Sequence, residues 1–475
     1  MGLIGVLAVG PSGARVARLP RPSHVKIENG RPGSRTWGAP DAMARPVDGY
    51  ASEISVFPGE ALHLHVSTAP AAAYRVEIYR LGWYGSMGGR LIDCTPSCTT
   101  STPGTTQPVP TPDPVTGEVR AAWSVTDTIT VGKNWTSGYY AARLVLPGGG
   151  QPASVLFVVK APPSVRSKIL VVAAVNTWQA YNTWGGKSLY PNSGQAPANH
   201  VSFDRPWSPG SQGQFLAWGI HVVRFLEREG YDVSYTTDVD IDRDPDELLA
   251  HRLVIVAGHD EYWTKAMRDA YERARDAGVN LAFMGANDGY WQVRYENDHR
   301  TIVAYKSKAD PVADRSQTTV MFRDLNPPRY ECSLLGVQHQ GSIERADVSH
   351  DFAVAPGALS DPWFAGTGFT TTSTLPGLVG PEWDQIVSPR DAWTCRFMSL
   401  TTFFHYEGPP GNADTVRYYA PSGARVFSAG SLQFVWGLDD YRTGAPGSAD
   451  PRLQQFMRNA IAEMTAPRVR GTPSG

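Results

Sequence analysis

The sequence predicts an α/β plus all-β fold, in which an N-terminal antiparallel β-sandwich is followed by a mostly parallel α/β domain. Between residues 49 and 160 the apolar residues form short β-rich runs separated by Gly, Pro and Asn clusters, which is typical of an antiparallel sandwich. Beyond residue 164, buried strand-like runs alternate with helical segments, which favours a parallel sheet covered on both faces. The 47 glycines and 38 prolines have no fixed period, which argues against a coiled coil or a helical bundle.

We expect three segments along the 475 residues. Residues 1–45 are an extended N-terminal arm, residues 46–161 are the β-sandwich domain, and residues 162–467 are the α/β catalytic domain. The apolar first ten residues resemble part of an export signal but lack a basic n-region, so a remnant signal and a plain tail both stay open. A secreted or extracytoplasmic location is favoured over a cytoplasmic one.

In the sandwich region, five runs alternate in polarity or are β-branched, and each predicts a strand. They are residues 61–66, 74–79, 121–125, 139–145 and 155–159. A stretch rich in Thr, Pro and Ser over residues 94–114 predicts a long surface loop. Residues 161–164, with two consecutive prolines, predict a stiff linker between the domains.

In the α/β region, residues 168–175 form a continuous apolar run of the buried-strand type. The spacing of apolar residues and the terminating glycines predict helices and further strands. The helices are residues 215–229, 264–276 and 452–465, and the strands are residues 232–237, 253–258 and 280–285. Residues 300–440 return to shorter strand-like segments. Ligands bind beyond the carboxyl ends of the strands in such sheets, so the loops there are the first place to look for a site.

Composition and charge exclude several classes of function. The 43 Lys plus Arg nearly balance the 45 Asp plus Glu, and a net charge of -2 leaves no basic footprint for nucleic acid. No window approaches the roughly eighteen uncharged apolar residues of a spanning helix. The four cysteines, Cys94, Cys98, Cys332 and Cys395, allow two disulfides with three connectivities, of which a local Cys94–Cys98 bridge is favoured. Their spacing is poor for zinc.

Three loops after predicted strands carry dense polar and aromatic side chains: residues 176–190, 258–263 and 285–288. His259, Asp260 and Glu261 stand where a strand passes to a helix, and could supply a general base, a metal ligand and an orienting partner. The alternative is that Asp260 or Glu261 only caps the helix that begins near Thr264. Signatures of serine hydrolases, zincins and dinucleotide-binding folds are absent from the sequence.

Several strings in the same order carry a family resemblance: residues 79–90, 135–140, 176–190, 258–263, 278–287 and 380–384. They resemble the N,N-dimethylformamidase large (β) subunit and its relatives over roughly residues 45–440. The α/β domain is accordingly expected to be class I glutamine amidotransferase-like. The known amidase also has a separate small subunit and a long N-terminal extension, whereas only a short arm precedes the sandwich here.

The resemblance implies a mononuclear Fe(III) centre held by two tyrosinates and one glutamate. By position, the glutamate is Glu261, one tyrosine is Tyr181, and the second is Tyr140. Tyr139 stays open as an alternative to Tyr140, because only one of two adjacent strand residues points inward. Phenolate and carboxylate oxygens are hard anionic donors that suit a highly charged ion, whose charge offsets the phenol pKa of about 10.

The resemblance also implies that His259 and Asn287 lie near the substrate and that Glu382 is a further acid or base. In this interpretation His259 takes a proton from water, Asn287 hydrogen-bonds the developing oxyanion, and Glu382 protonates the departing amine. An apolar wall that excludes bulk water is expected from four tryptophans: Trp178, Trp184, Trp263 and Trp291.

The sequence therefore predicts a metal-dependent amidase that hydrolyses the C–N bond of a small amide at Fe(III). Hydrolysis of a C–N bond is a firmer expectation than dimethylformamide itself, since a reshaped pocket changes the substrate. The alternative is a non-catalytic exported binding protein with an aromatic-lined ligand site. A cysteine amidotransferase-like hydrolase lacks a plausible nucleophile. The expected partners are the small amide and further copies of the chain in a homo-oligomer, with a small accessory subunit left open, and without nucleic acid or a membrane span.

Overall fold

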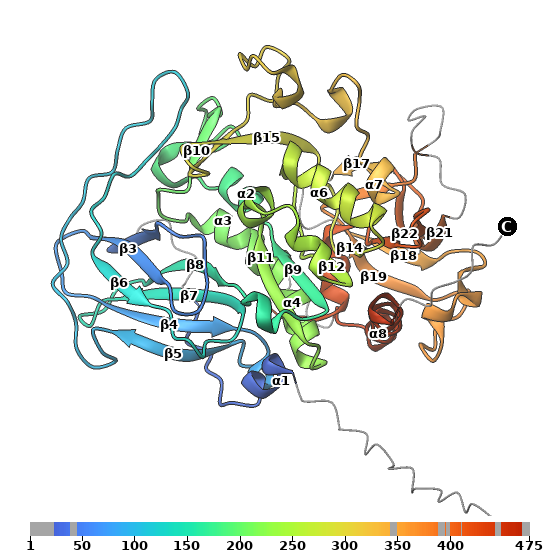
Figure 1. The fold of residues 1–475 in the computed structure, drawn as a ribbon, viewed down its shortest axis with the longest axis horizontal. Helices are drawn as coiled ribbons and strands as arrows, with labels where there is room; N and C mark the ends of the chain where they lie inside the picture. Colours follow the sequence, from blue (N-terminus) through green and yellow to red (C-terminus); the bar gives the residue numbers. More distant parts are fainter. Residues whose placement is uncertain are drawn as a thin grey trace, which may run out of the picture.

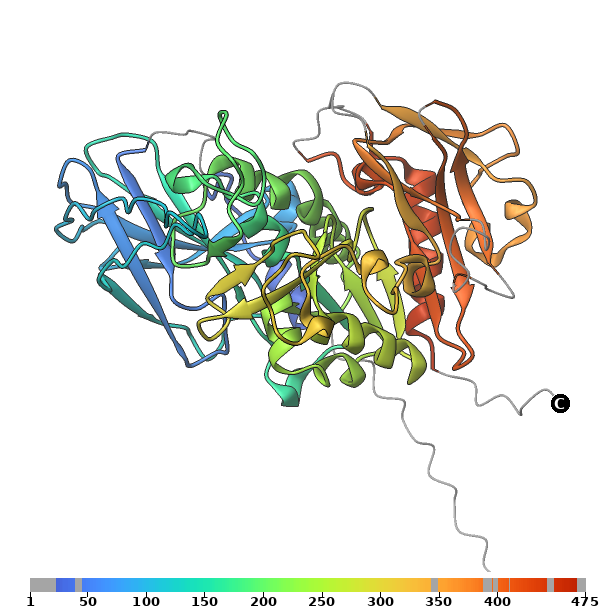
Figure 2. The ribbon, with the colours of Figure 1, turned by 90° about the horizontal axis from the view of Figure 1, so that it is seen from above.

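The computed structural model describes residues 23–38, 45–342, 349–387, 395, 400–409, 411–441 and 448–467. The chain runs from a β-rich region, drawn in blue and cyan, through an α/β centre in green to a second β-rich region in orange and red (Figure 1). The view from above has the same order (Figure 2). The fold is therefore a mixture of α and β structure, as predicted; the finer labels, sandwich and amidotransferase-like, stay predictions.

The described part of the N-terminal arm is not simply extended. It contains the short helix α1 (His24–Asn29), whose N-cap Ser23 accepts a hydrogen bond from the backbone N of Lys26 at 2.9 Å. Val25 and Trp37 are buried. The expectation of an extended arm is therefore wrong for this segment, because its apolar side chains pack onto the protein. Residues 1–22 and 39–44 of the arm lie outside the described residues.

The first β-rich region consists of two sheets that share one apolar core. The strand orders are β2-β8-β7-β4-β5 and β1-β3-β6, and β2 pairs with β8 in parallel while the other pairs are antiparallel. The strands are β1 (Val47–Ala51), β2 (Ser55–Val56), β3 (Ala61–Thr68), β4 (Arg75–Leu81), β5 (Gly89–Thr95), β6 (Asp127–Thr130), β7 (Gly138–Val145) and β8 (Ala153–Val159). Inward residues such as Leu64, Ile78 and Phe157 belong to one core cluster.

Residues 121–125 do not form the predicted strand. The backbone N of Ala121 donates to the carbonyl of Asp204 at 2.6 Å, and the ring of His65 lies 2.7 Å from the carbonyl of Trp123. The segment thus bonds to separate parts of the chain instead of one neighbouring strand. β6, slightly later in the sequence, pairs with β3 in its place.

The centre is a nine-stranded sheet of mixed direction, with the order β11-β9-β12-β14-β23-β22-β21-β18-β19. β11, β9, β12, β14 and β23 are parallel to one another. The strands are β9 (Ile169–Ala173), β11 (Val233–Thr237), β12 (Leu253–Val256), β14 (Asn280–Phe283), β18 (His350–Val354), β19 (Thr374–Val379), β21 (Thr401–Tyr406), β22 (Ala413–Tyr419) and β23 (Arg425–Ser428). The predicted strands over residues 168–285 are confirmed.

The expectation of a mostly parallel sheet is wrong for its second half. β22, β21, β18 and β19 pair antiparallel beyond β23. Their sequence lacks the helical segments that parallel crossovers require, so consecutive strands return directly beside one another. Two smaller sheets, of orders β10-β16-β15-β13 and β17-β20, complete the strands. They comprise β10 (His200–Ser202), β13 (Tyr262–Thr264), β15 (Trp291–Glu296), β16 (Thr301–Val303), β17 (Gln338–Ser342) and β20 (Glu382–Gln385).

Helices cover both faces of the parallel strands. Alternate residues of β9 face opposite ways: Val171 joins the core cluster that contains Phe225 of α4, and Val172 joins the cluster that contains Tyr271 of α6. The first cluster also contains Tyr79 and Tyr139 of the first β-rich region, so the two regions share a core. The α-helices are α2 (Val175–Ala180), α3 (Pro209–Gln214), α4 (Ile220–Arg228), α5 (Asp238–Arg243), α6 (Lys265–Asp276), α7 (Cys332–Leu335) and α8 (Pro451–Thr465).

The three predicted helices are confirmed, with one local difference. The helix predicted over residues 215–229 begins with a π-helical turn, Phe215–Gly219, before α4. α8 begins after Asp450, whose side chain accepts from the backbone N of Arg452. Short 3₁₀ turns are Tyr84–Ser86, Pro163–Val165, Trp184–Gly186, Glu247–Ala250, Arg315–Gln317, Phe322–Asp324, Ala358–Ser360, Pro362–Phe364 and Leu432–Gly437.

The cysteines pair as Cys94–Cys98 and Cys332–Cys395. The favoured local bridge is confirmed, and the second bridge joins α7 to a segment 63 residues later in the sequence. Among the described residues, no helix is long and apolar enough to cross a membrane.

Candidate active site

Three predicted loops meet at one edge of the parallel strands. Tyr181 follows β9 and the short helix α2, Glu261 follows β12, and Asn287 follows β14. Because β9, β12 and β14 are adjacent and parallel, their carboxyl ends lie side by side. Gly258, with φ of 85°, starts the turn after β12, where a Cβ atom would lie 2.7 Å from Cβ of Trp218. Only glycine fits there without displacing its neighbour.

The carboxylate of Glu261 is the centre of the site. The hydroxyl of Tyr181 donates to its Oε2 at 3.1 Å, and the hydroxyl of Tyr190 lies 2.8 Å from Oε1 and 2.7 Å from Oε2. Nε2 of His259 lies 3.3 Å from Oε2. Burial alone would raise the pKa of Glu261, but the hydrogen bond and charge of His259 hold this pKa below its usual range. Glu261 is thus a buried carboxylate surrounded by hydrogen-bond donors.

Glu261 does not cap the following helix. The N-cap of α6 is Thr264, whose Oγ1 accepts from the backbone N of Met267 at 3.1 Å. Neither Asp260 nor Glu261 is that N-cap, and the backbone N of Asp260 donates to Oδ1 of Asp288 at 2.9 Å. The interpretation of Asp260 or Glu261 as a helix cap is therefore wrong, and the carboxylate of Glu261 is left for the cluster around it.

Tyrosines and one lysine line the same position. The rings of Tyr181 and Tyr190 have centroids 4.6 Å apart, and the hydroxyl of Tyr262 donates to that of Tyr190 at 2.7 Å. Nζ of Lys306 donates to the hydroxyl of Tyr262 at 2.7 Å and lies 4.0 Å from the Tyr190 ring centroid. Burial, followed by the charge of Glu261, raises the pKa of all three phenols well above the usual value. Burial lowers the pKa of Lys306 to about 8.

Sequence reasoning missed Tyr190, Tyr262 and Lys306 as site residues. Tyr190 and Tyr262 lie inside two of the strings that carry the family resemblance, so their phenol oxygens were a usable signal. Lys306 follows β16 and has φ of 53°, and nothing in the sequence places it next to Tyr190.

Three further predicted residues, His259, Asn287 and Glu382, connect to Glu261 through His259. Nδ2 of Asn287 donates to Oε2 of Glu382 at 2.9 Å, and Nδ1 of His259 lies 3.7 Å from the same oxygen. Burial would lower the pKa of His259, but Glu382 and Glu261 raise it above its usual value. We call Tyr181, Tyr190, His259, Glu261, Asn287 and Glu382 the Glu261 cluster. It brings together five of the six predicted site residues.

Tyr140 is not part of this cluster. It is fully buried in the core of the first β-rich region, where its hydroxyl donates to the carbonyl of Thr136 at 2.7 Å and its ring stacks on Trp135. Tyr139, on the opposite face of β7, packs against Phe215, and the charges that raise its pKa after burial are Asp238 and Asp260. The structure therefore does not retain Tyr140 as a candidate ligand, and Tyr190 supplies the second phenol beside Glu261.

The prediction that four tryptophans form an apolar wall at the site is largely wrong. Trp178 packs on Tyr139 and Phe215, Trp184 donates to Asp48, and Trp263 lies in the core on the α6 side of the sheet. Trp291 does lie at the site, with its ring 5.0 Å from Nζ of Lys306. Aromatic surface near Glu261 comes instead from tyrosines, whose hydroxyls make the site polar.

The donor set decides which metal the cluster could hold. Among the described residues, no group of three or more His, Cys, Asp or Glu side chains could bind a metal ion. Two phenol oxygens and one carboxylate within hydrogen-bond distance of each other form a different set, and hard oxygen donors suit a hard cation. The residues that could hold it are Tyr181, Tyr190 and Glu261.

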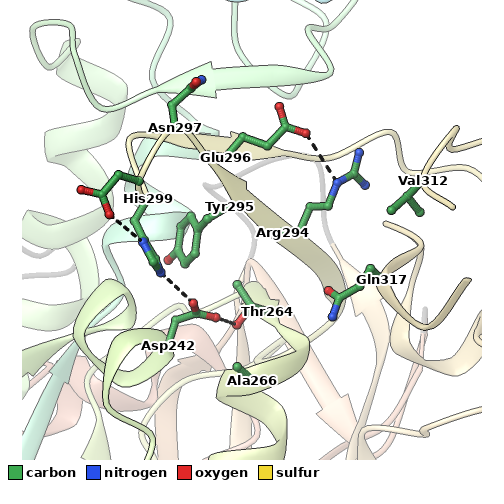
Figure 3. A pocket seen from close by; sticks show the side chains of 11 residues that line it. Asp242, Thr264, Ala266, Arg294, Tyr295, Glu296, Asn297, His299, Val312 and Gln317 are labelled. Carbon is green, nitrogen blue, oxygen red and sulfur yellow. Dashed lines mark hydrogen bonds and ion pairs between the residues drawn. The ribbon is translucent and has the colours of Figure 1, made fainter. Parts of the chain in front are cut away.

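A separate cavity of about 560 Å³ lies behind the start of α6 and is lined by none of the predicted site residues (Figure 3). There His299 lies 2.9 Å from Oδ2 of Asp242, and Thr264 donates to the other oxygen of Asp242. Tyr295, which also lines the cavity, donates to Oδ1 of Asn176 at 2.6 Å. Nδ2 of Asn176 in turn donates to the carbonyl of Tyr262 at 3.0 Å. These contacts connect the lining of the cavity to Tyr262, the residue that follows Glu261.

Comparison with known proteins gives one clear result. The family model described as N,N-dimethylformamidase beta subunit-like, C-terminal, matches residues 75–448, and no curated protein matches the chain. A family 123 glycoside hydrolase from Clostridium perfringens is 9% identical with a TM-score of 0.11, and the match covers 55% of this chain and 48% of that one. So weak a likeness carries no argument. Because the family model spans more than half of the residues, the chain belongs to the N,N-dimethylformamidase beta subunit-like family.

Proposed function

We propose that this chain hydrolyses the C–N bond of a small amide at an Fe(III) centre held by Tyr181, Tyr190 and Glu261. The observation that supports it most is that two half-buried phenols share one buried carboxylate. The family description supports the amidase class, because it names an N,N-dimethylformamidase. The expected accessory subunit and homo-oligomer stay predictions.

The electrostatics of the phenols fit a trivalent ion. Burial and Glu261 raise the pKa of Tyr181 and Tyr190, so neither phenol ionises at neutral pH without added positive charge. A bound ferric ion would supply that charge, act as a Lewis acid toward an amide carbonyl and lower the pKa of bound water. Tyr262 and Lys306 then hold the Tyr190 oxygen in place through a chain of hydrogen bonds.

His259 and Glu382 are placed to move protons. His259 lies between the carboxylates of Glu261 and Glu382, so a proton that it accepts is stabilised from both sides. Glu382 is within reach of His259 and is held by Asn287, which suits transfer of a proton to the departing nitrogen. Since Nδ2 of Asn287 donates to Glu382, we assign Asn287 first to positioning this acid; its role toward an oxyanion stays a prediction.

The test is release of amine from small amides by the iron-loaded protein. Formamide, acetamide and N,N-dimethylformamide cover unsubstituted and substituted nitrogen. Glu382→Gln should lower kcat by about 10²–10⁴, the usual contribution of a positioned acid or base, while iron content is unchanged. Glu296→Gln, a half-exposed carboxylate of the separate cavity, is the matched control and should keep full activity. Absence of amine release from all three amides would contradict the proposal.

A further inference from the structure

A further cavity, of about 470 Å³, is lined by four segments that are distant in the sequence. They are the N-terminal arm, the turn that joins β4 to β5, helix α4, and the chain after the Leu432–Gly437 turn. The lining residues are Arg35, Ser86, Met87, Arg224, Asp440 and Tyr441. None of them belongs to the Glu261 cluster or to the cavity of Figure 3. The proposed function therefore gives this cavity no role.

The buried lining residue Arg224 uses little of its hydrogen-bonding capacity. Its side chain is 4% exposed, and its Nε donates to Oδ1 of Asp439 at 2.7 Å. Its Nη1 is buried without a hydrogen-bond partner among the described residues, and its Nη2 donates to none of them. Arg80, which is also buried, donates through all three of its nitrogens. A guanidinium has five N–H groups, so Arg224 has donors left for a ligand.

Two aromatic rings hold the Arg224 guanidinium beside the cavity. Its central carbon lies 4.9 Å from the ring centroid of Trp83 and 4.5 Å from that of Tyr441. Tyr441 in turn stacks on Trp37, with ring centroids 5.8 Å apart. Because Asp439 holds Nε and the rings pack against the group, Nη1 and Nη2 are the atoms that remain for a ligand. Two adjacent N–H groups of a guanidinium match the two oxygens of a carboxylate.

The turn between β4 and β5 is strained where it borders the cavity. Tyr84 and Ser86 have φ of 45° and 73°, in the left-handed region that residues other than glycine rarely adopt. Oδ1 of Asn29 accepts from the backbone N of Tyr84 at 2.9 Å. Nε1 of Trp37 donates to the carbonyl of Met87 at 3.2 Å. The turn lies in the first of the strings that carry the family resemblance, and strain held by such contacts is typical of binding sites.

The charges around the cavity favour an anion with a single charge. Arg35 and Arg224 are positive, and Asp440 is negative. Asp439 does not neutralise Arg224 alone, since its Oδ2 also lies 3.9 Å from Nη1 of Arg228. Arg35 is exposed and makes no ion pair within the described part of the chain. The lining therefore has one positive charge more than its negative charges balance.

We infer that this cavity binds a small organic monocarboxylate, whose oxygens accept hydrogen bonds from Nη1 and Nη2 of Arg224. Arg35 adds a second positive charge, and Met87 and the ring of Tyr441 offer apolar surface to the hydrocarbon part. A volume of about 470 Å³ is usual for a small-molecule site. A phosphate dianion would exceed the positive charge of the lining and leave the apolar surface unused. The inference requires neither iron nor amide hydrolysis, so it is independent of the proposed function.

Calorimetric titration of the full-length protein with three probes tests this inference. Butyrate has a carboxylate and a short tail, inorganic phosphate has charge without a tail, and 1-butanol has a tail without charge. We expect one butyrate to bind per chain, phosphate to bind at least about 10-fold more weakly, and 1-butanol not to bind, since the paired charged hydrogen bonds and the apolar contact are both needed. Tighter binding of phosphate, or no binding of butyrate, would overturn the inference.

Two variants identify the binding residues. Arg224→Lys keeps the positive charge but lacks the paired donors, and should weaken butyrate binding by about 10- to 100-fold. Because a change at a buried arginine also affects folding, Arg35→Gln at an exposed position is the second test and should weaken binding by about 2- to 5-fold. Arg273→Gln, which changes an exposed arginine of α6, is the matched control and should bind as the wild type does.

The same titrations distinguish this cavity from the Glu261 cluster. Glu261→Gln should bind butyrate as the wild type does, because Glu261 does not line the cavity. Unchanged butyrate affinity in both Arg224→Lys and Arg35→Gln would overturn the inference. Loss of binding only in Glu261→Gln would also overturn it, since the carboxylate would then bind at the Glu261 cluster.

Discussion

Two buried polar clusters of this protein have opposite electrostatics. The first, which we call the Arg80–Glu227 ion cluster, joins Arg80 of β4 to Glu227 of α4, with Nη2 of Arg80 2.7 Å from Oε1 of Glu227 and neither side chain exposed. Glu28 pairs with Arg90 at 2.6 Å in the same cluster. Burial would lower the pKa of Arg80, but Glu227 raises it well above its usual value. Each acid there has a nearby guanidinium.

The Glu261 cluster is buried at His259 and Glu261 and partly buried at its other acid, Glu382, and it is crowded with acids. Glu382 and three phenols surround Glu261, and His259 and Lys306 are the basic groups closest to it. Burial, followed by the charges of Asp260 and Asp384, also raises the pKa of Asp288, the residue after Asn287, well above its usual range. The difference teaches that each acid of the Arg80–Glu227 ion cluster has its own guanidinium, which stabilises the fold. In the Glu261 cluster, the carboxylates and phenols together outnumber the two basic groups beside them, His259 and Lys306. Such crowding of perturbed acids is typical of functional sites.

The largest effect on stability is expected from a substitution that breaks the Arg80–Glu227 ion cluster. Glu227→Gln leaves the buried guanidinium of Arg80 without its carboxylate, and should lower the free energy of unfolding by about 3–5 kcal/mol. Denaturant unfolding measures it. Asp246→Asn, which removes an exposed partner of Arg273, is the control and should change stability by less than about 1 kcal/mol. Similar losses in both variants would contradict the distinction between buried and exposed pairs.

The opposite change in stability is expected at Asp288, because removal of its carboxyl charge should stabilise the protein. A carboxyl pKa raised in the folded state makes the folded protein retain a proton that the unfolded chain releases, so stability falls as pH rises above about 4. Asp288→Asn keeps the acceptor for the backbone N of Asp260 and removes this penalty. The metal-free variant should be more stable than the wild type at pH 7 and equally stable near pH 3, as measured by denaturant unfolding at both pH values. A loss of stability at pH 7 would show that the acid crowding is not destabilising.

A smaller effect on stability is expected from the loss of a neutral hydrogen bond in the Arg80–Glu227 ion cluster, compared with the loss of an exposed one. The buried hydroxyl of Tyr235 donates to Oε1 of Glu227 at 2.8 Å, and Tyr235→Phe should cost about 1–2 kcal/mol in unfolding free energy. Tyr406→Phe loses an equally short but exposed bond to the carbonyl of Pro409, and should have no measurable effect. If the two variants were equal, burial would not be what gives the cluster its strength.

The sequence was sufficient to predict β9, β11, β12 and β14 and the residues that directly follow them, but not the fifth parallel strand, β23. Glu261, His259 and Asn287 were identifiable because each stands between a continuous apolar run and a turn, where chain order dictates spatial position. The prediction of Tyr140 as a ligand was wrong for a different reason. Strand alternation shows that Tyr139 and Tyr140 point to opposite faces, but it does not show which face meets the α/β region.

Other features depend on contacts between distant segments. Lys306 lies over the ring of Tyr190, and the ring of Trp291 lies beside Lys306. Both positions depend on the small sheet that contains β15 and β16, whose arrangement no local sequence pattern predicts. Trp178 and Trp263 are buried in cores, because large aromatic side chains gain more from burial than a polar site offers, and Trp184 is partly buried against Trp123. The antiparallel half of the central sheet was missed since its short strands carry no helical crossovers between them.

Iron content measured beside the visible spectrum tests the central claim most directly. The account predicts about one iron per chain with tyrosinate-to-iron absorption in the wild type, both lost in Tyr190→Phe and Glu261→Gln. Tyr140→Phe, in the core of the first β-rich region, should retain both. A folded wild type that stays metal-free with ample iron would contradict the account, as would loss of iron from Tyr140→Phe but not from Tyr190→Phe.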